Sequence, residues 1–213
     1  MNANERKVWR WLSDAPLILL SAKPKLAAAL NSAALCAALL LGGCTGLPER
    51  IAPVRDFDAE RYLGTWYEIA RLDHRFERGL EQVTATYGRD AHGRITVDNR
   101  GYDTASGQWE TVSGTAAPVG DPRVAHLKVQ FFFPFGVSYV VFGLDPDYQS
   151  AYVTSFNRDV LWFLARTPQV SAEQRQAFIA SARAHEFDLS ELLWVKQLPP
   201  AARVEARTED EQK

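Results

Sequence analysis

Residues 63–70 read LGTWYEIA, and this stretch decides the fold. The run is rich in aromatic and β-branched residues, so it predicts a strand, which we place at 65–73. Successive side chains of a strand point to opposite faces of the sheet. If Trp66 points into the core, Glu68 and Ala70 are therefore expected on the same face.

Similar short segments follow, and turn residues separate them, as in Asp90-Ala91-His92-Gly93 and Val119-Gly120-Asp121-Pro122. Strands at such intervals are typical of an all-β barrel or sandwich. The predicted strands are 65–73, 81–88, 94–103, 108–117, 124–132, 137–145, 149–156 and 160–167.

One helix follows the strands. Ser171 and Gln174 form a capping-box pattern, and residues 172–186 carry Phe178 and Ala182 at helical spacing. Residues 192–195 read LLWV and predict a short strand that returns to the sheet. The expected order is therefore many strands, one late helix and one short strand.

The start of the chain has the composition of an export signal. Residues 26–41 are apolar and follow Lys23 and Lys25, and the stretch is short for a membrane span. It ends in Leu41-Gly42-Gly43-Cys44, which resembles the bacterial lipobox. In that interpretation the thiol of Cys44 takes up a diacylglyceryl group. The alternative is a signal peptide that is cleaved elsewhere and contains a fortuitous cysteine.

These signals predict four parts of the chain. They are a lipoprotein signal peptide at 1–43 that is removed, a lipidated tether at 44–56, one domain at 57–198, and a disordered charged tail at 199–213. Five of the 24 Lys and Arg residues and two of the 26 Asp and Glu residues lie in the leader, so the rest carries a net charge near −5. That sign argues against nucleic acid as a partner, because phosphate binding needs a basic surface.

Three motifs resemble those of lipocalins. Gly64-Thr65-Trp66-Tyr67 resembles their G-x-W-Y signature on the first strand, and Arg166 resembles the arginine on their last barrel strand. Asp145-Pro146-Asp147-Tyr148 partly matches their Thr-Asp-Tyr turn. The likeness is closest to the bacterial outer-membrane lipocalin lipoproteins, through residues 62–87 and 161–168.

The resemblance implies an eight-stranded antiparallel up-and-down barrel with one C-terminal α-helix packed outside and a short ninth strand. It also implies that Gly64, Trp66 and Arg166 form the closed floor, with the guanidinium stacked across the indole.

If side chains alternate along every strand with Trp66 pointing inward, the inward-facing residues form a mostly apolar lining with a few polar groups, as in small-molecule sites. Each of these side chains has plain core packing as its alternative role. The expected ligand-binding residues are Glu68, Val83, Ala85, Tyr87, Val97, Asn99, Val112, Val129, Phe131, Tyr139, Val141 and Trp162.

Residues 131–135 read FFFPF, and strand alternation can bury at most half of them. Phe132, Phe133 or Phe135 is therefore expected to be exposed near a loop. On a tethered protein, such a patch predicts a rim that faces lipid or a partner. Packing under a neighbouring loop or helix is the alternative.

The resemblance implies a carrier anchored to the outer membrane, with its barrel facing the periplasm, that binds, stores or transfers fatty acids, lysophospholipids or phospholipids. A monomer or weak dimer without cofactor or metal is expected. Catalysis is not expected, since acylation would block Cys44 and the four histidines lack metal-ligand spacing. The alternative is a structural or protein-interaction lipoprotein whose barrel is filled by its own side chains.

Overall fold

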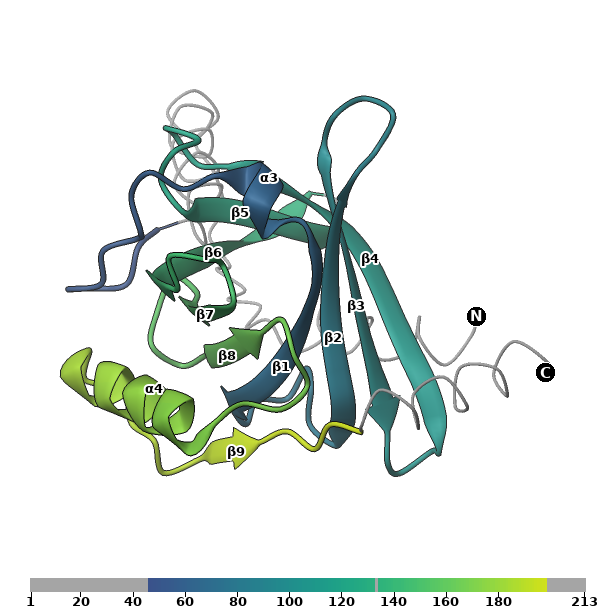
Figure 1. Ribbon diagram of the computed structural model, residues 1–213. Coiled ribbons are helices and arrows are strands. Elements are labelled where there is room, and N and C mark those ends of the chain that lie inside the picture. Colours follow the sequence, from purple (N-terminus) through teal and green to yellow (C-terminus); the bar gives the residue numbers. More distant parts are fainter. Residues whose placement is uncertain (1–45, 133, 199–213) are drawn as a thin grey trace, which may run out of the picture. The chain divides into compact units, whose positions relative to one another are not determined.

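The computed structural model describes residues 46–132 and 134–198, which form a closed antiparallel barrel with a helix outside (Figure 1). The barrel and its ninth strand are as the resemblance implied, and a sandwich is excluded. Within the described residues, no helix has the length and apolar character needed to cross a membrane. The elements are α3 (Ala59–Tyr62), β1 (Gly64–Leu72), β2 (Leu80–Arg89), β3 (Ile95–Asp103), β4 (Gln108–Pro118), β5 (His126–Phe132), β6 (Phe135–Leu144), β7 (Ser150–Thr154), β8 (Leu161–Ala165), α4 (Ala172–Ala184) and β9 (Leu192–Trp194).

The barrel closes through β1, which pairs with β8 on one side and with β2 on the other. Because neighbouring strands alternate in direction, the loops divide between two ends. The closed end holds α3 and the β2–β3, β4–β5 and β6–β7 loops. The opposite end, which we call the mouth, holds the β1–β2, β3–β4, β5–β6 and β7–β8 loops.

A seam opens between β1 and β2 toward the mouth, because their pairing stops at Tyr67 and Thr84. The residues after β9 fill this seam. The side-chain amide of Gln197 donates hydrogen bonds to the carbonyl oxygens of Glu68 (2.7 Å) and Val83 (2.9 Å). The C-terminal segment thus completes a wall that β1 and β2 leave incomplete.

Two apolar clusters form, one inside the barrel and one between the barrel wall and α4. In the outer cluster the rings of Phe163 and Phe178 stack with centroids 4.9 Å apart. Both hydrogen bonds of the capping box are present between Ser171 and Gln174 at the start of α4. The predicted helix is confirmed, and it covers the outer face of the sheet (Figure 1).

A bulge in β1 changes which side chains point inward. The pairing of β1 with β8 shifts register between Glu68 and Ala70, so strict alternation ends there. Ala70 was expected inside with Trp66, but it lies in the outer cluster. Arg71 points inward instead, where its side chain is fully buried. The prediction for Ala70 was wrong because the sequence pattern carries no signal for the extra residue.

The described part of the predicted tether, residues 46–56, lies against the barrel. Ser138 Oγ donates to the carbonyl oxygen of Gly46 (2.8 Å), and Ile51 is buried in the outer cluster. The backbone N–H of Val54 donates to Val141 O (2.9 Å). Cys44, which carries the lipidation prediction, lies outside the described residues, as do the leader and the tail 199–213.

The closed end is built around Trp66 and Arg166. The guanidinium carbon lies 3.8 Å from the indole ring centroid, and the same group donates hydrogen bonds to the carbonyl oxygens of Thr65 (3.0 Å) and Arg61 (2.8 Å). Gly64 begins β1 with a φ of +94°, which L side chains rarely adopt, and a Cβ there would lie 3.3 Å from Arg166 Nη1. The glycine of the motif therefore allows both the entry into β1 and the approach of the arginine.

Replacement of Arg166 by Ala should lower the free energy of unfolding by about 2–3 kcal/mol, because the cation–π contact and two hydrogen bonds to carbonyls are lost. Urea unfolding followed by tryptophan fluorescence measures the change. Arg123→Ala, at an exposed ion pair of the same end, is the control and should change stability by less than about 0.5 kcal/mol. Equal losses in both variants would contradict this role of Arg166.

Candidate functional site

The barrel interior contains most of the predicted ligand-binding residues. All of them are buried or half-buried, and eight belong to the interior cluster. The four buried members are Tyr87, Val97, Val129 and Val141, and the four half-buried ones are Ala85, Phe131, Tyr139 and Trp162. Contact of these side chains with a ligand stays a prediction.

The other four predicted residues lie outside the interior apolar cluster. Glu68 and Val83 are buried on β1 and β2, on the two sides of the seam. Asn99 and Val112 are half-buried and directly opposite each other on β3 and β4. Neither belongs to the interior apolar cluster.

Three tyrosine side chains lie in the closed half of the barrel interior. The hydroxyl of Tyr62 lies 2.7 Å from that of Tyr139, and the Tyr62 ring lies 4.6 Å from the Trp66 ring and 5.3 Å from the Tyr87 ring, between centroids. Burial raises the pKa of Tyr62, Tyr87 and Tyr139 above the ordinary value, so all three phenols stay neutral and can donate hydrogen bonds. These rings, with Trp66, occupy the closed half of the barrel.

A group of charged and polar side chains lies at the mouth, and we call it the mouth cluster: Glu68, Arg71, His74, Glu77 and Trp162. Arg71 Nη1 donates to Glu68 Oε1 (2.7 Å), while its Nη2 donates to the carbonyl oxygen of Glu77 (2.7 Å). Trp162 Nε1 donates to Glu77 Oε2 (2.9 Å), and His74 Nε2 lies 3.2 Å from the same oxygen. The β1–β2 loop is thereby attached to the inner wall of the barrel.

The two carboxylates of the mouth cluster differ in proton affinity. Burial, together with the negative charge of Glu77, raises the pKa of Glu68 to about 8 despite the contact with Arg71. Burial also acts to raise the pKa of Glu77, but hydrogen bonds from His74 and Trp162 and the charge of Arg71 outweigh it, so that pKa is lowered. Near neutral pH the charge of Arg71 is therefore balanced mainly by Glu77.

Several buried side-chain polar atoms have no hydrogen-bond partner among the described residues. They include Nε of Arg71 and Nδ1 of His74 in the mouth cluster, and Oδ1 of Asn99 on β3. Unpaired buried polar atoms are costly, and they usually indicate bound water or a ligand group. The barrel thus offers a cationic donor, Arg71 Nε, in the mouth cluster and a neutral acceptor, Asn99 Oδ1, halfway along β3.

Sequence reasoning missed Tyr62, Arg71, His74 and Glu77. Tyr62 lies on the four-residue helix α3, for which the strand pattern carries no signal. Arg71 follows the bulge in β1, for which the sequence pattern carries no signal. His74 and Glu77 lie in the β1–β2 loop, and only the fold shows that this loop reaches the barrel wall. Among the described residues, no three His, Cys, Asp or Glu side chains gather as a metal site.

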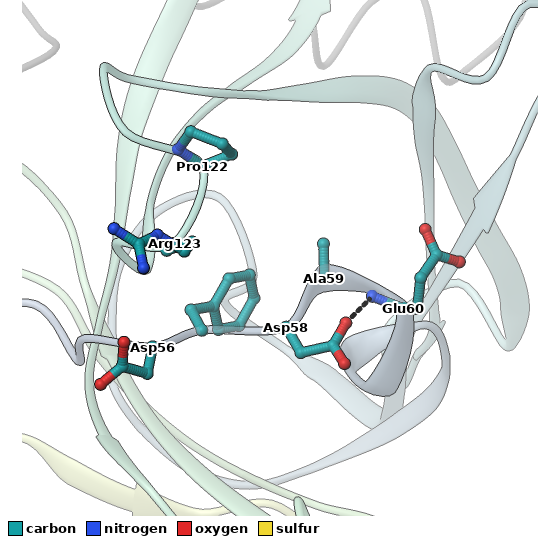
Figure 2. A pocket seen from close by; sticks show the side chains of 7 residues that line it. Asp56, Asp58, Ala59, Glu60, Pro122 and Arg123 are labelled. Carbon is teal, nitrogen blue, oxygen red and sulfur yellow. Dashed lines mark hydrogen bonds between the residues drawn. The ribbon is translucent and has the colours of Figure 1, made fainter.

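Two surface hollows lie at the closed end, away from the mouth cluster. The larger, of about 420 Å³, is formed by residues before and at the start of α3, including Phe57 and Ala59, and by Pro122 and Arg123 of the β4–β5 loop (Figure 2). The other, of about 270 Å³, lies between the β2–β3 hairpin and the start of β5. None of the twelve predicted ligand-binding residues lines either hollow.

Substitution of Glu68 by Gln should remove part of the pH dependence of stability. The raised pKa of Glu68 stabilises the folded state fully below the ordinary value of 4.5, and this stabilisation is lost as the pH rises through 8. From about pH 5 to about pH 9, wild type should therefore lose a few kcal/mol relative to Glu68→Gln, measured by urea unfolding. Glu173→Gln, at an exposed carboxylate, should keep the wild-type slope. An unchanged slope in Glu68→Gln would contradict the raised pKa.

Comparison with known proteins agrees with this architecture. The profile of the "Lipocalin-like domain" family matches residues 57–197. "Outer membrane lipoprotein Blc" of Citrobacter freundii is 48% identical over 167 residues, covering 78% of this chain and 94% of the relative. The protein of the same name from Vibrio cholerae is 48% identical over 160 residues, covering 75% and 94%. Insecticyanin of the tobacco hornworm Manduca sexta superposes with a TM-score of 0.59 at 19% identity, covering 74% and 89%. The chain therefore belongs to the lipocalin family, in the branch that holds the bacterial Blc lipoproteins.

Proposed function

We propose that this protein binds amphipathic lipids, such as fatty acids and lysophospholipids, as a lipid-anchored carrier of the bacterial outer membrane. The observation that carries the proposal is the polarity gradient of the barrel interior. Apolar side chains line its walls, while Arg71 Nε in the mouth cluster and Asn99 Oδ1 halfway along β3 remain unpaired. An acyl chain would lie among the apolar residues, and its head group would meet these two polar atoms.

The apolar contribution is large enough for useful affinity. Burial of apolar surface is worth about 25 cal/mol per Å², so one enclosed acyl chain gains several kcal/mol. After the cost of association, micromolar binding is a reasonable expectation. Within the proposal the protein binds and releases its ligand without chemical change, so it acts as a binding protein and not as an enzyme.

The location is proposed from Cys44 and from the relatives. The lipobox-like Leu41-Gly42-Gly43-Cys44 supports acylation of Cys44 after removal of residues 1–43. The names of the relatives from Citrobacter freundii and Vibrio cholerae place those proteins at the outer membrane as lipoproteins. By extension, we propose that the barrel of this chain is held at the periplasmic face of that membrane.

A second candidate function is a structural or protein-interaction lipoprotein with a filled barrel. The observation in its favour is the row of Tyr62, Tyr87 and Tyr139, which with Trp66 occupies the closed half of the interior. The β1–β2 loop also spans part of the mouth through Glu77. Mass spectrometry of lipids extracted from the purified acylated protein distinguishes the two functions, since a filled barrel would yield no stoichiometric lipid.

Phe131 and Phe142 form a matched pair for testing the pocket. Phe131 lies at the interior cluster and Phe142 in the outer cluster beside α4. Phe131→Ala should weaken fatty-acid binding about tenfold with little loss of stability. Phe142→Ala should lower the free energy of unfolding by about 3 kcal/mol and leave affinity unchanged. Quenching of tryptophan fluorescence during ligand titration gives the affinities, and urea unfolding gives the stabilities. Parallel losses of both properties in Phe131→Ala would contradict the pocket.

Cys44→Ala should abolish acylation and release the protein from the membrane fraction, because the thiol is the only group that can accept the diacylglyceryl chain at this site. Metabolic labelling with palmitate and membrane fractionation measure both effects. Cys36→Ser, within the leader, should leave labelling and fractionation unchanged. Palmitate labelling that survives in Cys44→Ala would refute the anchor.

A further inference from the structure

Exposed aromatic side chains gather at one end of the barrel. Large apolar residues with well exposed side chains are few among the described residues, and four of them are phenylalanines of the mouth loops. Phe76 lies in the β1–β2 loop, Phe132 and Phe135 flank the β5–β6 turn, and Phe156 lies in the β7–β8 loop. Phe135 is 65% exposed. We call these four residues the aromatic rim.

The closed end has the opposite character. Exposed ion pairs lie there, such as Arg89–Glu60 between β2 and α3 and Arg94–Asp90 in the β2–β3 hairpin. None of the exposed large apolar residues lies in the β2–β3, β4–β5 or β6–β7 loops. The two ends of one barrel therefore present surfaces suited to different surroundings, water at the closed end and an apolar or interfacial medium at the mouth.

The N-terminal end of the described chain contacts the barrel wall in its mouth half. The first described residue, Gly46, accepts a hydrogen bond from Ser138, and Ser138 is three residues along β6 from Phe135, or about 10 Å. Cys44 precedes Gly46 by two residues, which span at most about 7 Å. An acyl anchor on Cys44 is thus confined close to the aromatic rim. The exposed Leu47 lies on the same connecting segment.

We propose that the mouth is a membrane-contact surface, in which the aromatic rim lies against the bilayer that holds the acyl chains of Cys44. The proposal rests on the acylation of Cys44 in the proposed function. Phenylalanine side chains enter the boundary between head groups and acyl chains favourably. The guanidinium of Arg75, 5.1 Å from the Phe76 ring centroid, would then lie at the level of anionic head groups. In this orientation a lipid passes between bilayer and barrel with little exposure of its acyl chain to water.

Cysteine labelling of the acylated protein tests the surface. Acylation blocks Cys44, and Cys36 leaves with the leader, so one introduced cysteine is the single reactive thiol. The test variants are Phe76→Cys, Phe135→Cys and Phe156→Cys. The matched controls are His92→Cys and Asp147→Cys, at exposed positions in closed-end loops. Each carries an NBD fluorophore and is reconstituted into vesicles of phosphatidylethanolamine and phosphatidylglycerol, with or without brominated acyl chains.

Brominated chains should quench the three rim labels at least about threefold more strongly than the two control labels, and rim emission should shift to shorter wavelength. Equal quenching at both ends, or none at the rim, would overturn the proposal. If the rim labels are shielded from water in the absence of vesicles, and the protein has twice the mass of one chain, the proposal is also overturned. The surface would then bind a second copy of the chain.

A further variant separates docking from tethering. Phe135→Asp should reduce quenching of the label at position 76 by about half or more, whereas Leu193→Asp, at an exposed apolar residue of β9, should not. A normal signal in Phe135→Asp would contradict a direct role of the rim. The intact mass reports acylation separately. A protein without the acyl mass would refute the anchor. Quenching of the rim labels by added vesicles would then still show whether the aromatic rim contacts a bilayer.

Discussion

The stack of Arg166 on Trp66 is the contact on which this barrel depends. β1 must leave α3, turn sharply at Gly64 and pair with two different neighbours, β2 and β8, at once. Arg166 follows directly after β8, and its guanidinium contacts the indole and the carbonyls of Arg61 and Thr65 together. The last barrel strand is thereby joined to the first at the point where the sheet closes. A closed sheet has no free edge at this end, which also removes a site for aggregation.

The bulge in β1 divides the interior into two chemically distinct halves. Before it, alternation directs Trp66 into an aromatic, tightly packed space with neutral tyrosines. After it, the shifted register brings Arg71 to the inside beside Glu68, and the β1–β2 loop adds Glu77. One extra residue in one strand thus creates both the polar mouth and the difference between its two carboxylates. In a lipid carrier, that arrangement separates the acyl chain from the head group along the barrel axis.

Much of the fold could be predicted from the sequence, because its strongest signals are local. Strand alternation, turn residues and the Ser171–Gln174 capping box located every strand and α4 to within a few residues. The motif residues Gly64, Trp66 and Arg166 meet in space as the resemblance implied. The interior side of β1 was only half predictable, since neither Ala70 nor Arg71 signals a register shift. The mouth cluster could not be predicted from the sequence, because His74 and Glu77 come from a loop whose path depends on tertiary contacts.

The seam beside β1 has a consequence for how the molecule matures. The Gln197 side chain bridges the backbones of β1 and β2, and the carbonyl oxygen of Lys196 accepts a hydrogen bond from the backbone N–H of Gln82. The wall is therefore complete only when the end of the domain is in place. Gln197 is separated along the chain from Glu68 by 129 residues and from Val83 by 114. Pairings between such distant segments form slowly. This part of the wall is therefore expected to close late in folding.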